Sequence, residues 1–214
     1  MISSNDTLLI SPTQSMPFDD VTVIILAGGQ GRRMGGVDKG LQLFQGKPLI
    51  VHILERLEKQ AGTILISANR HIDRYQAYGY PVLPDSVSGF PGPLAGFLTG
   101  LQHCRTPYLA TVPCDTPFVH EQLIERLRTA LVTEEADIAI ATTDDSGIPK
   151  IQSVFTLMKS NLGNRLETYL KDGRHKLDQW FATLKMVSVH FEEKDAFINI
   201  NTLEELTAYQ ERHF

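Results

Sequence analysis

The chain has 214 residues, of which 42% are hydrophobic and 21% charged, so it is long enough to bury one sizeable core and short for two. Its formal net charge of -5 provides no overall positive field, which argues against nucleic acid or an anionic membrane surface as a partner. The two cysteines, Cys104 and Cys114, fit neither a disulfide framework nor a CxxC metal pair. We therefore expect one soluble domain in a reducing compartment, the cytoplasm.

The first 20 residues are rich in Ser, Thr and Pro and contain no Lys or Arg. They lack the basic start and the hydrophobic middle of a secretory signal. No apolar run along the chain approaches the length that a bilayer-spanning helix needs. We expect a flexible arm over residues 1–20, followed by one folded domain over residues 21–214.

From residue 21 onward, short aliphatic or β-branched runs alternate with amphipathic segments. The pattern predicts strands at 21–26, 63–67, 108–113 and 136–143, and helices at 49–60, 93–104 and 119–132. In the helix at 49–60 the apolar face consists of Ile50, Ile53, Leu54 and Leu57. Apolar strands separated by helices predict a single-domain, doubly wound α/β fold, with a mostly parallel sheet and helices on both of its faces.

The second half of the chain is less regular. It predicts a strand at 151–158, a helix at 160–173 that ends at Gly173, and a strand at 184–191. Residues 197–214 predict a short strand and a final helix, with Asn201 or Thr202 as its cap.

A glycine-rich, positively charged loop, LAGGQGRRMGGVDKG, follows the first strand. In an open parallel sheet, ligands bind at the carboxyl ends of the strands, where the winding direction reverses. Glycines let backbone amides approach phosphates, and Arg32, Arg33 and Lys39 are candidate charge partners. Neither a Walker loop nor a GxGxxG fingerprint fits, because no Gly-Lys-Ser/Thr occurs and Met34 stands where the third glycine belongs. A tight turn is the structural alternative, but the charge cluster favours phosphate binding.

The longer segment LAGGQGRRMGGVDKGLQLFQGKPL resembles the nucleotidyltransferase signature L-A-G-G-x-[SG]-x-R-M-G, followed by a lysine and then G-K-P-L. With GGVDKG, and with SANRH and PGPLAG downstream, the chain is most similar to the molybdenum cofactor guanylyltransferases. The resemblance implies a Rossmann-like nucleotidyltransferase fold, whose N-terminal part binds the nucleotide and whose C-terminal part faces a pterin. It further implies transfer of GMP from GTP to the terminal phosphate of molybdopterin, or of its molybdenum-loaded form, with release of pyrophosphate.

The resemblance implies two groups of nucleotide-site residues. The first group wraps the nucleotide and holds its phosphates: Leu26, Ala27, Gly28, Gly29, Arg33 and Lys39. The second group surrounds the guanine and ribose: Ser67, at a position that is often Asn in the relatives, Asn69 and Asp85. Without the resemblance, Asp85 reads as a turn residue after Pro84.

Asp115, in PCDTPF, matches the carboxylate that holds Mg²⁺ in such enzymes, and with Arg33 and Lys39 it completes the implied catalytic set. The residues themselves favour the same role, because Asp115 follows an apolar strand at the sheet edge that carries the glycine loop. A hard cation there can bridge protein and phosphate oxygens. The structural alternative is a cap for a helix that begins near Phe118.

For the pterin side, the resemblance implies Asn199 and Asn201, whose structural alternative is a strand end and a cap. Arg174 and Lys176 lie in a basic run that is typical of a solvated surface, although a pterin phosphate also needs cations. The implied partners are GTP, molybdopterin, other molybdenum cofactor proteins and acceptor enzymes.

Three alternatives stay open at this point. The same scaffold could transfer CMP to molybdopterin, or a nucleotide to a sugar or alcohol phosphate. It could also be a non-catalytic GTP-binding carrier of the cofactor. Pyrophosphate release separates the enzymes from the carrier.

Overall fold

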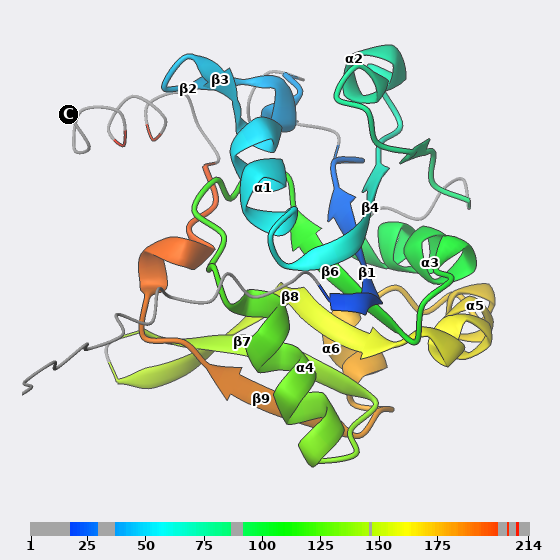
Figure 1. Cartoon of the computed structure of the whole chain (residues 1–214). Coiled ribbons are helices and arrows are strands. Elements are labelled where there is room, and N and C mark those ends of the chain that lie inside the picture. Colours follow the sequence, from blue (N-terminus) through cyan, green and yellow to red (C-terminus); the bar gives the residue numbers. More distant parts are fainter. Residues whose placement is uncertain are drawn as a thin grey trace, which may run out of the picture.

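The computed structural model describes residues 18–29, 37–86, 92–145 and 147–200, together with Glu205 and Tyr209. Its strands are β1 (Phe18–Leu26), β2 (Leu43–Phe44), β3 (Lys47–Pro48), β4 (Ala61–Ser67), β5 (Val82–Leu83), β6 (Tyr108–Pro113), β7 (Ile138–Asp145), β8 (Ile148–Lys159) and β9 (Met186–His190). Its α-helices are α1 (Leu49–Leu57), α2 (Ile72–Gln76), α3 (Pro93–His103), α4 (Leu123–Thr133), α5 (Gly163–Lys171) and α6 (Leu177–Phe181) (Figure 1). Short 3₁₀ helices are η2 (Lys39–Leu41), η3 (Ser160–Leu162) and η4 (Lys194–Phe197).

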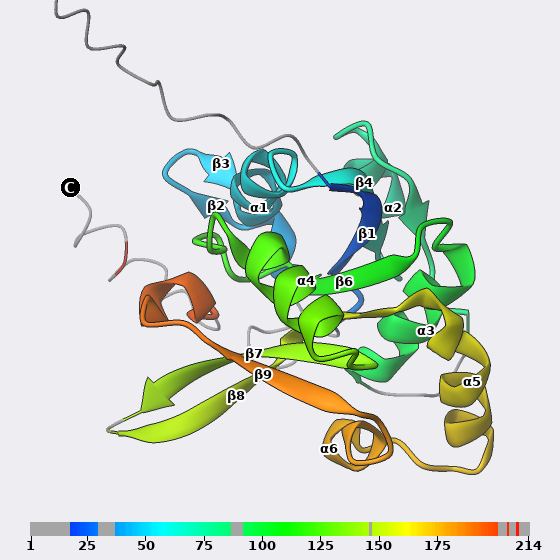
Figure 2. The same ribbon diagram turned by 60° about the horizontal axis from the view of Figure 1, so that its bottom comes forward.

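The main sheet that these described residues form has seven strands in the order β5-β4-β1-β6-β8-β7-β9, and β2 pairs separately with β3. β1 runs parallel to β4 and β6, and β7 runs parallel to β9. β8 is antiparallel to both of its neighbours, so β7 and β8 form a long hairpin whose paired ends project away from the rest of the sheet (Figure 2). The prediction of a mostly parallel sheet is confirmed.

The winding direction reverses at β1. The chain passes from β1 to β4 and β5 on one side, and then returns to β6 on the other side of β1. In the register of this region, Leu26 pairs with Ser67 of β4 and with Pro113 of β6. The loops that follow β1, β4 and β6 therefore leave the sheet at one edge, which is where doubly wound sheets bind ligands.

Helices cover both faces of the sheet, as predicted. Alternate residues of β1 point to opposite faces, with Val23 in the core beneath α1 and α4, and Ile24 in the core beneath α3, α5 and α6. The apolar face expected for α1 is buried, with Ile50, Ile53 and Leu57 at 0% exposure. Each such side chain contributes roughly 1.5–3 kcal/mol through removal from water. These layers fix the strand ends from which the loops start.

Several predicted boundaries need correction. β1 begins at Phe18, so the last three residues of the expected arm belong to the sheet, and residues 1–17 lie outside the described part. α4 begins at Leu123, four residues later than the pattern indicated. The segment predicted as one helix over 160–173 is η3 followed by α5, which ends at Lys171, before Gly173 with its φ of +76°.

The short strand expected at the start of 197–214 is wrong, because Phe197 ends η4 and residues 198–200 form no strand. This segment instead pairs with a loop: the Ile200 amide donates to the Asp115 carbonyl at 2.8 Å. The predicted final helix, with its cap at Asn201 or Thr202, lies outside the described residues apart from Glu205 and Tyr209.

The pattern did not indicate the β2–β3 hairpin, α2 or α6. The hairpin turns at Gln45 and Gly46, which have φ of +50° and +76°. Each of the two helices spans five residues, too few to show a full amphipathic period. α6 is held instead by Trp180 and Phe181, both buried in the core beneath α3.

Candidate nucleotide site

The loops after β1 and β6 start side by side, because the Cys114 amide donates to the Leu26 carbonyl at 3.1 Å. Leu26 itself ends β1 and packs partly buried against the α3 core, so its side chain serves the fold. Whatever binds beyond these strand ends therefore meets both loops at once.

Lys39 and Asp115 meet across this edge. Lys39 Nζ donates to Asp115 Oδ2 at 2.9 Å, although the two residues are 76 positions apart in the chain. Their side chains are 22% and 13% exposed, so the pair is partly shielded and still reaches solvent. The structure thus brings together two of the three residues that were expected to do the chemistry. The third, Arg33, lies outside the described residues, as does Arg32.

A second cluster surrounds Asp85, which follows β5. Asp85 Oδ1 accepts from Ser67 Oγ at 2.9 Å, and Asp85 Oδ2 accepts from Asn69 Nδ2 at 2.7 Å. The Asp85 amide also donates to Asn69 Oδ1 at 2.9 Å. The three residues predicted around the base and ribose therefore form one network. Within it, Ser67 is 1% exposed and lies beneath Asp85, so its hydroxyl supports the carboxylate.

The described start of the glycine loop lies against this cluster. The Ala27 amide donates to the Ser67 carbonyl at 2.7 Å, so this N–H is used within the fold. A Cβ at Gly28 would stand 2.9 Å from Asn69 Nδ2 and 3.3 Å from Asp85 Oδ2, so a side chain there would displace the cluster. Gly29 shows no such contact within 4 Å.

Arg70 is a cation at this site to which the sequence analysis gave no role. Its Nη2 donates to the Gly29 carbonyl at 3.2 Å, so its guanidinium lies at the glycine loop. The available signal was its position directly after Asn69, at the same sheet edge. With Lys39, it places a second positive charge where phosphates are expected.

The C-terminal segment reaches the same edge. Thr116 Oγ1, which is fully buried, donates to Asn199 Oδ1 at 2.7 Å, next to the bond between Ile200 and Asp115. Asn199 is thereby placed beside the loop that carries Asp115, whereas Asn201 lies outside the described residues.

Arg174 and Lys176 lie in the connection between α5 and α6. Arg174 Nη2 donates to Asp172 Oδ2 at 2.7 Å, and its guanidinium stacks 4.4 Å from the centre of the Tyr169 ring. The Lys176 carbonyl accepts from the Tyr169 hydroxyl at 2.8 Å. These contacts are local to the α5–α6 layer.

Neither Asp115 nor Asp85 has the purely structural role that its position in the sequence also allows. Asp115 does not cap α4, because that helix begins at Leu123 with Gln122 as its N-cap. Asp85 is bonded to Ser67 and Asn69, which a simple turn residue does not require. Cys104 and Cys114 are buried free thiols, as expected for core residues, and burial raises the pKa of Cys114 far above its usual value.

Within the described ranges, no three His, Cys, Asp or Glu side chains gather so that they could hold a metal ion. A Mg²⁺ ion at Asp115 would take its other ligands from phosphate oxygens and water. That donor set is the one Mg²⁺ commonly uses in nucleotide enzymes, so the site fits the ion.

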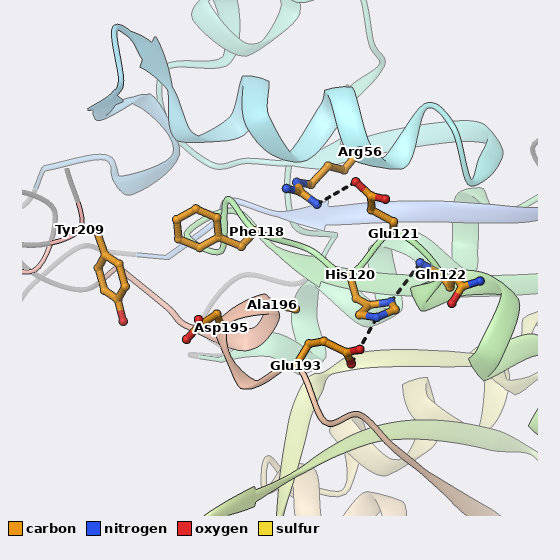
Figure 3. A pocket seen from close by; sticks show the side chains of 9 residues that line it. All are labelled: Arg56, Phe118, His120, Glu121, Gln122, Glu193, Asp195, Ala196 and Tyr209. Carbon is orange, nitrogen blue, oxygen red and sulfur yellow. Dashed lines mark hydrogen bonds and ion pairs between the residues drawn. The ribbon is translucent and has the colours of Figure 1, made fainter. Parts of the chain in front are cut away.

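A separate cavity of about 410 Å³ lies between α1, the β6–α4 connection and η4, and its lining does not include the Lys39–Asp115 pair (Figure 3). Two side-chain contacts lie within its walls, Arg56 with Glu121 at 3.6 Å and His120 with Glu193 at 3.4 Å. Burial lowers the pKa of His120, and the neighbouring Glu193 opposes that shift.

No helix in the part of the chain that the structure describes is long and apolar enough to cross a membrane.

Comparison with known proteins gives a consistent family. The family model described as a MobA-like NTP transferase domain matches residues 23–187. A molybdenum cofactor guanylyltransferase of Ralstonia nicotianae is 50% identical over 202 residues, which cover 92% of this chain and 99% of that protein. One of Bordetella petrii is 49% identical over 187 residues, covering 87% of this chain and 95% of that protein.

Solved structures agree at the level of the fold. The crystal structure of molybdopterin-guanine dinucleotide biosynthesis protein A from Archaeoglobus fulgidus has a TM-score of 0.72 at 22% identity, covering 90% of this chain and 98% of that one. CMP:2-keto-3-deoxy-manno-octonic acid synthetase, in a complex with CTP, has a TM-score of 0.68 at 12% identity, covering 92% and 100%. By its family model and its curated relatives, the chain belongs to the MobA-like NTP transferases and, among them, to the molybdenum cofactor guanylyltransferase family.

Proposed function

We propose that this protein transfers GMP from GTP to the terminal phosphate of molybdopterin, or of its molybdenum-loaded form, and releases pyrophosphate. The observation that carries the proposal is the Lys39–Asp115 pair, which stands at the winding reversal beside the glycine loop. The curated relatives, which are named for guanylyl transfer to the cofactor, support the same reaction across nearly the whole chain.

In the proposed step, an oxygen of the molybdopterin phosphate attacks the α-phosphorus of GTP. A new P–O bond forms, the bond between the α-phosphorus and the bridging oxygen breaks, and pyrophosphate leaves with the electron pair. No covalent bond to the protein is needed, so the chain acts by positioning the reactants and by stabilising charge.

Lys39 is the residue that we assign to the leaving group. Its ammonium donates to Asp115 Oδ2 at the sheet edge that carries the glycine loop. A positive charge at this position attracts phosphate oxygens and stabilises the negative charge that develops on pyrophosphate. Arg33 is proposed for the same task, and Arg70 adds charge at the Gly29 end of the loop.

Asp115 is the residue that we propose holds Mg²⁺. When bound there, Mg²⁺ would withdraw negative charge from the phosphates of the nucleotide. Asp115 sits on a short, well-anchored loop, since its carbonyl binds Ile200 and its carboxylate binds Lys39. That anchoring fixes the carboxylate relative to Lys39.

Asp85 is proposed to recognise the guanine. The N1–H and exocyclic N–H₂ groups of guanine are adjacent donors, and a carboxylate can accept from both. Ser67 and Asn69 each donate to one Asp85 oxygen, which holds the carboxylate in place and leaves lone pairs for the base.

Two other functions compete with this one. A CMP transferase would share the fold, since a synthetase that binds CTP has the same architecture. A non-catalytic carrier would bind GTP and release no pyrophosphate. A lysine paired with a carboxylate at the phosphate end favours catalysis over simple binding.

The test is a calorimetric titration of the purified protein with GTP, CTP, ATP and UTP, each with and without Mg²⁺. We expect tight binding of GTP alone, strengthened by Mg²⁺. A preference for CTP would move the protein to cytidylyl transfer, and failure to bind any nucleotide would overturn the assignment of the glycine loop.

A further inference from the structure

Tyr75 occupies an unusual position beneath the candidate site. It lies on the five-residue helix α2, and its side chain is 0% exposed. Its hydroxyl donates to Asp38 Oδ1 at 2.5 Å, and Asp38 is itself only 8% exposed. A carboxylate and a phenol buried together are costly to desolvate, so their pairing calls for a reason beyond packing.

Asp38 directly precedes Lys39. It occupies the N-cap of η2, but its side chain makes no capping hydrogen bond there. Instead, its carboxylate turns to Tyr75, and its carbonyl accepts from Gln42 Nε2 at 3.1 Å. The Asp38 carboxylate thus binds a buried tyrosine in place of the helix N-terminus. This bond fixes the backbone directly before Lys39.

The Tyr75 hydroxyl also touches the residue on the other side of Lys39. A Cβ at Gly40 would lie 2.6 Å from the Tyr75 oxygen and 3.3 Å from Cys114 Cβ. Glycine is therefore required for this close approach, and Cys114 directly precedes Asp115. Burial, with Cys114 and Asp38 adding to it, raises the pKa of Tyr75 far above its usual value, so the hydroxyl stays a donor.

We infer that Tyr75 is a positioning residue for the proposed transfer. Its hydroxyl binds Asp38 and packs closely beside Gly40, the two residues that flank Lys39. These contacts hold the Lys39 ammonium opposite Asp115. This inference rests on the proposed function, in which Lys39 acts on the leaving pyrophosphate. Tyr75 touches no reacting atom and acts through Lys39.

The segment that follows β4, from Asn69 to Tyr75, contacts the candidate site at three points. Asn69 binds Asp85, Arg70 binds the Gly29 carbonyl, and Tyr75 binds Asp38. One short segment thus contacts the cluster around Asp85, the start of the glycine loop and the residue that precedes Lys39. We expect that loss of the hydrogen bond from Tyr75 to Asp38 lowers kcat and leaves the contacts around Asp85 intact.

The test compares Tyr75→Phe with Tyr80→Phe in pyrophosphate release. Tyr80 is a matched control, because its hydroxyl also donates to a carboxylate, that of Glu58, away from the site. Tyr75→Phe should lower kcat roughly tenfold or more, as small misplacements of a catalytic group do, with little change in the KM for GTP. Tyr80→Phe should leave both constants near those of the unaltered protein.

A double-mutant cycle with Lys39→Ala separates positioning from general damage. If Tyr75 acts through Lys39, Tyr75→Phe should change kcat less than about twofold once Lys39 is alanine. An equal fold loss in both backgrounds would overturn the inference, as would unaltered kcat in Tyr75→Phe.

If Tyr75→Phe does not fold, Asp38→Asn and Asp38→Ala take its place in the cycle. Asparagine can still accept from the Tyr75 hydroxyl, so it should retain more kcat than alanine, and both losses should vanish in the Lys39→Ala background. Equal losses for the two variants, or losses that persist there, would contradict the inference. The proposed function itself fails separately, if neither the unaltered protein nor Tyr80→Phe releases pyrophosphate.

Discussion

The candidate nucleotide site and the α5–α6 layer of this molecule are built differently. In the candidate site, side chains at or after the ends of four strands bond to one another, as in Lys39 with Asp115 and Asp85 with Ser67. In the α5–α6 layer, by contrast, Arg174 bonds to Asp172, two residues away. Bonds between distant segments fix these side chains relative to one another, whereas a bond between near neighbours in the chain does not position distant segments. We therefore expect substitutions in the candidate nucleotide site to reduce turnover far more than substitutions in the α5–α6 layer.

Asp115→Ala is expected to have the largest effect. Loss of the proposed Mg²⁺ ligand should abolish most pyrophosphate release, while circular dichroism shows a folded protein. Asp172→Ala, which removes an exposed carboxylate paired with Arg174, is the control and should retain activity. A folded Asp115→Ala protein with near-normal turnover would remove the metal assignment.

Lys39→Ala should cost about 3 kcal/mol in the transition state, on the order of a hundredfold in kcat, as for other single electrostatic donors. The matched control is Lys47→Ala, which breaks an exposed pair with Glu55. Steady-state kinetics with GTP measure both. An increase confined to KM would mean that Lys39 contributes ordinary ground-state binding.

Asp85→Asn tests base recognition. A hydrogen bond to a charged acceptor is worth roughly 1.5–3 kcal/mol, so the Kd for GTP should rise about tenfold or more. Inosine triphosphate, which lacks the exocyclic amine, should bind the unaltered protein more weakly than GTP does. In Asp85→Asn, the ratio of the Kd for inosine triphosphate to the Kd for GTP should be smaller than in the unaltered protein. An unchanged ratio would place the guanine away from Asp85.

Asn199→Ala and Arg174→Ala compare two residues that were both predicted to face the pterin. The bond to Thr116 places Asn199 beside Asp115, where we propose that its amide contacts the pterin. Loss of that one neutral hydrogen bond to the substrate should raise the KM for molybdopterin several-fold. Arg174→Ala should change that KM less than about twofold, since exposed pairs are weak. The reverse order would place the pterin on the α5–α6 layer.

The smallest effect concerns pH. Burial lowers the pKa of His120 in the folded protein, while the unfolded value is about 6.5. Stability from this residue is therefore present above that value and is lost as pH falls through it toward the folded pKa. Glu193, Arg126 and Glu121 surround the ring, and Glu193 and Glu121 moderate the loss.

His120→Gln should consequently flatten the dependence of Tm on pH between about 7 and 5, relative to the unaltered protein. A pH profile that is identical in His120→Gln and the unaltered protein would show that another group governs it.

Much of the candidate nucleotide site could be predicted from the sequence, because short motifs directly after apolar runs mark the strand ends that carry it. Apolar runs before LAGG and PCD indicate strands, and strand ends at one edge of a parallel sheet bring Lys39 and Asp115 near each other. The direct bond between them and the enclosure of Ser67 beneath Asp85 depend on side-chain directions, which no spacing reveals.

The second half was harder for a physical reason. α6 is too short to show a helical period, and its stability comes from Trp180 and Phe181 packed under a helix some 80 residues earlier in the chain. The segment around Asn199 is fixed by bonds to the loop at Asp115, not by its own strand propensity. Tyr75 and Arg70 likewise gain their positions from partners that are distant in sequence.

The most direct measurement for the central claim is pyrophosphate release from GTP, in the presence of molybdopterin and Mg²⁺, by the unaltered protein and by Asp115→Ala. We predict release with GTP, much less with CTP, and almost none from the variant. Release that is equal with CTP, or that persists in the folded variant, would contradict guanylyl transfer at the Lys39–Asp115 edge.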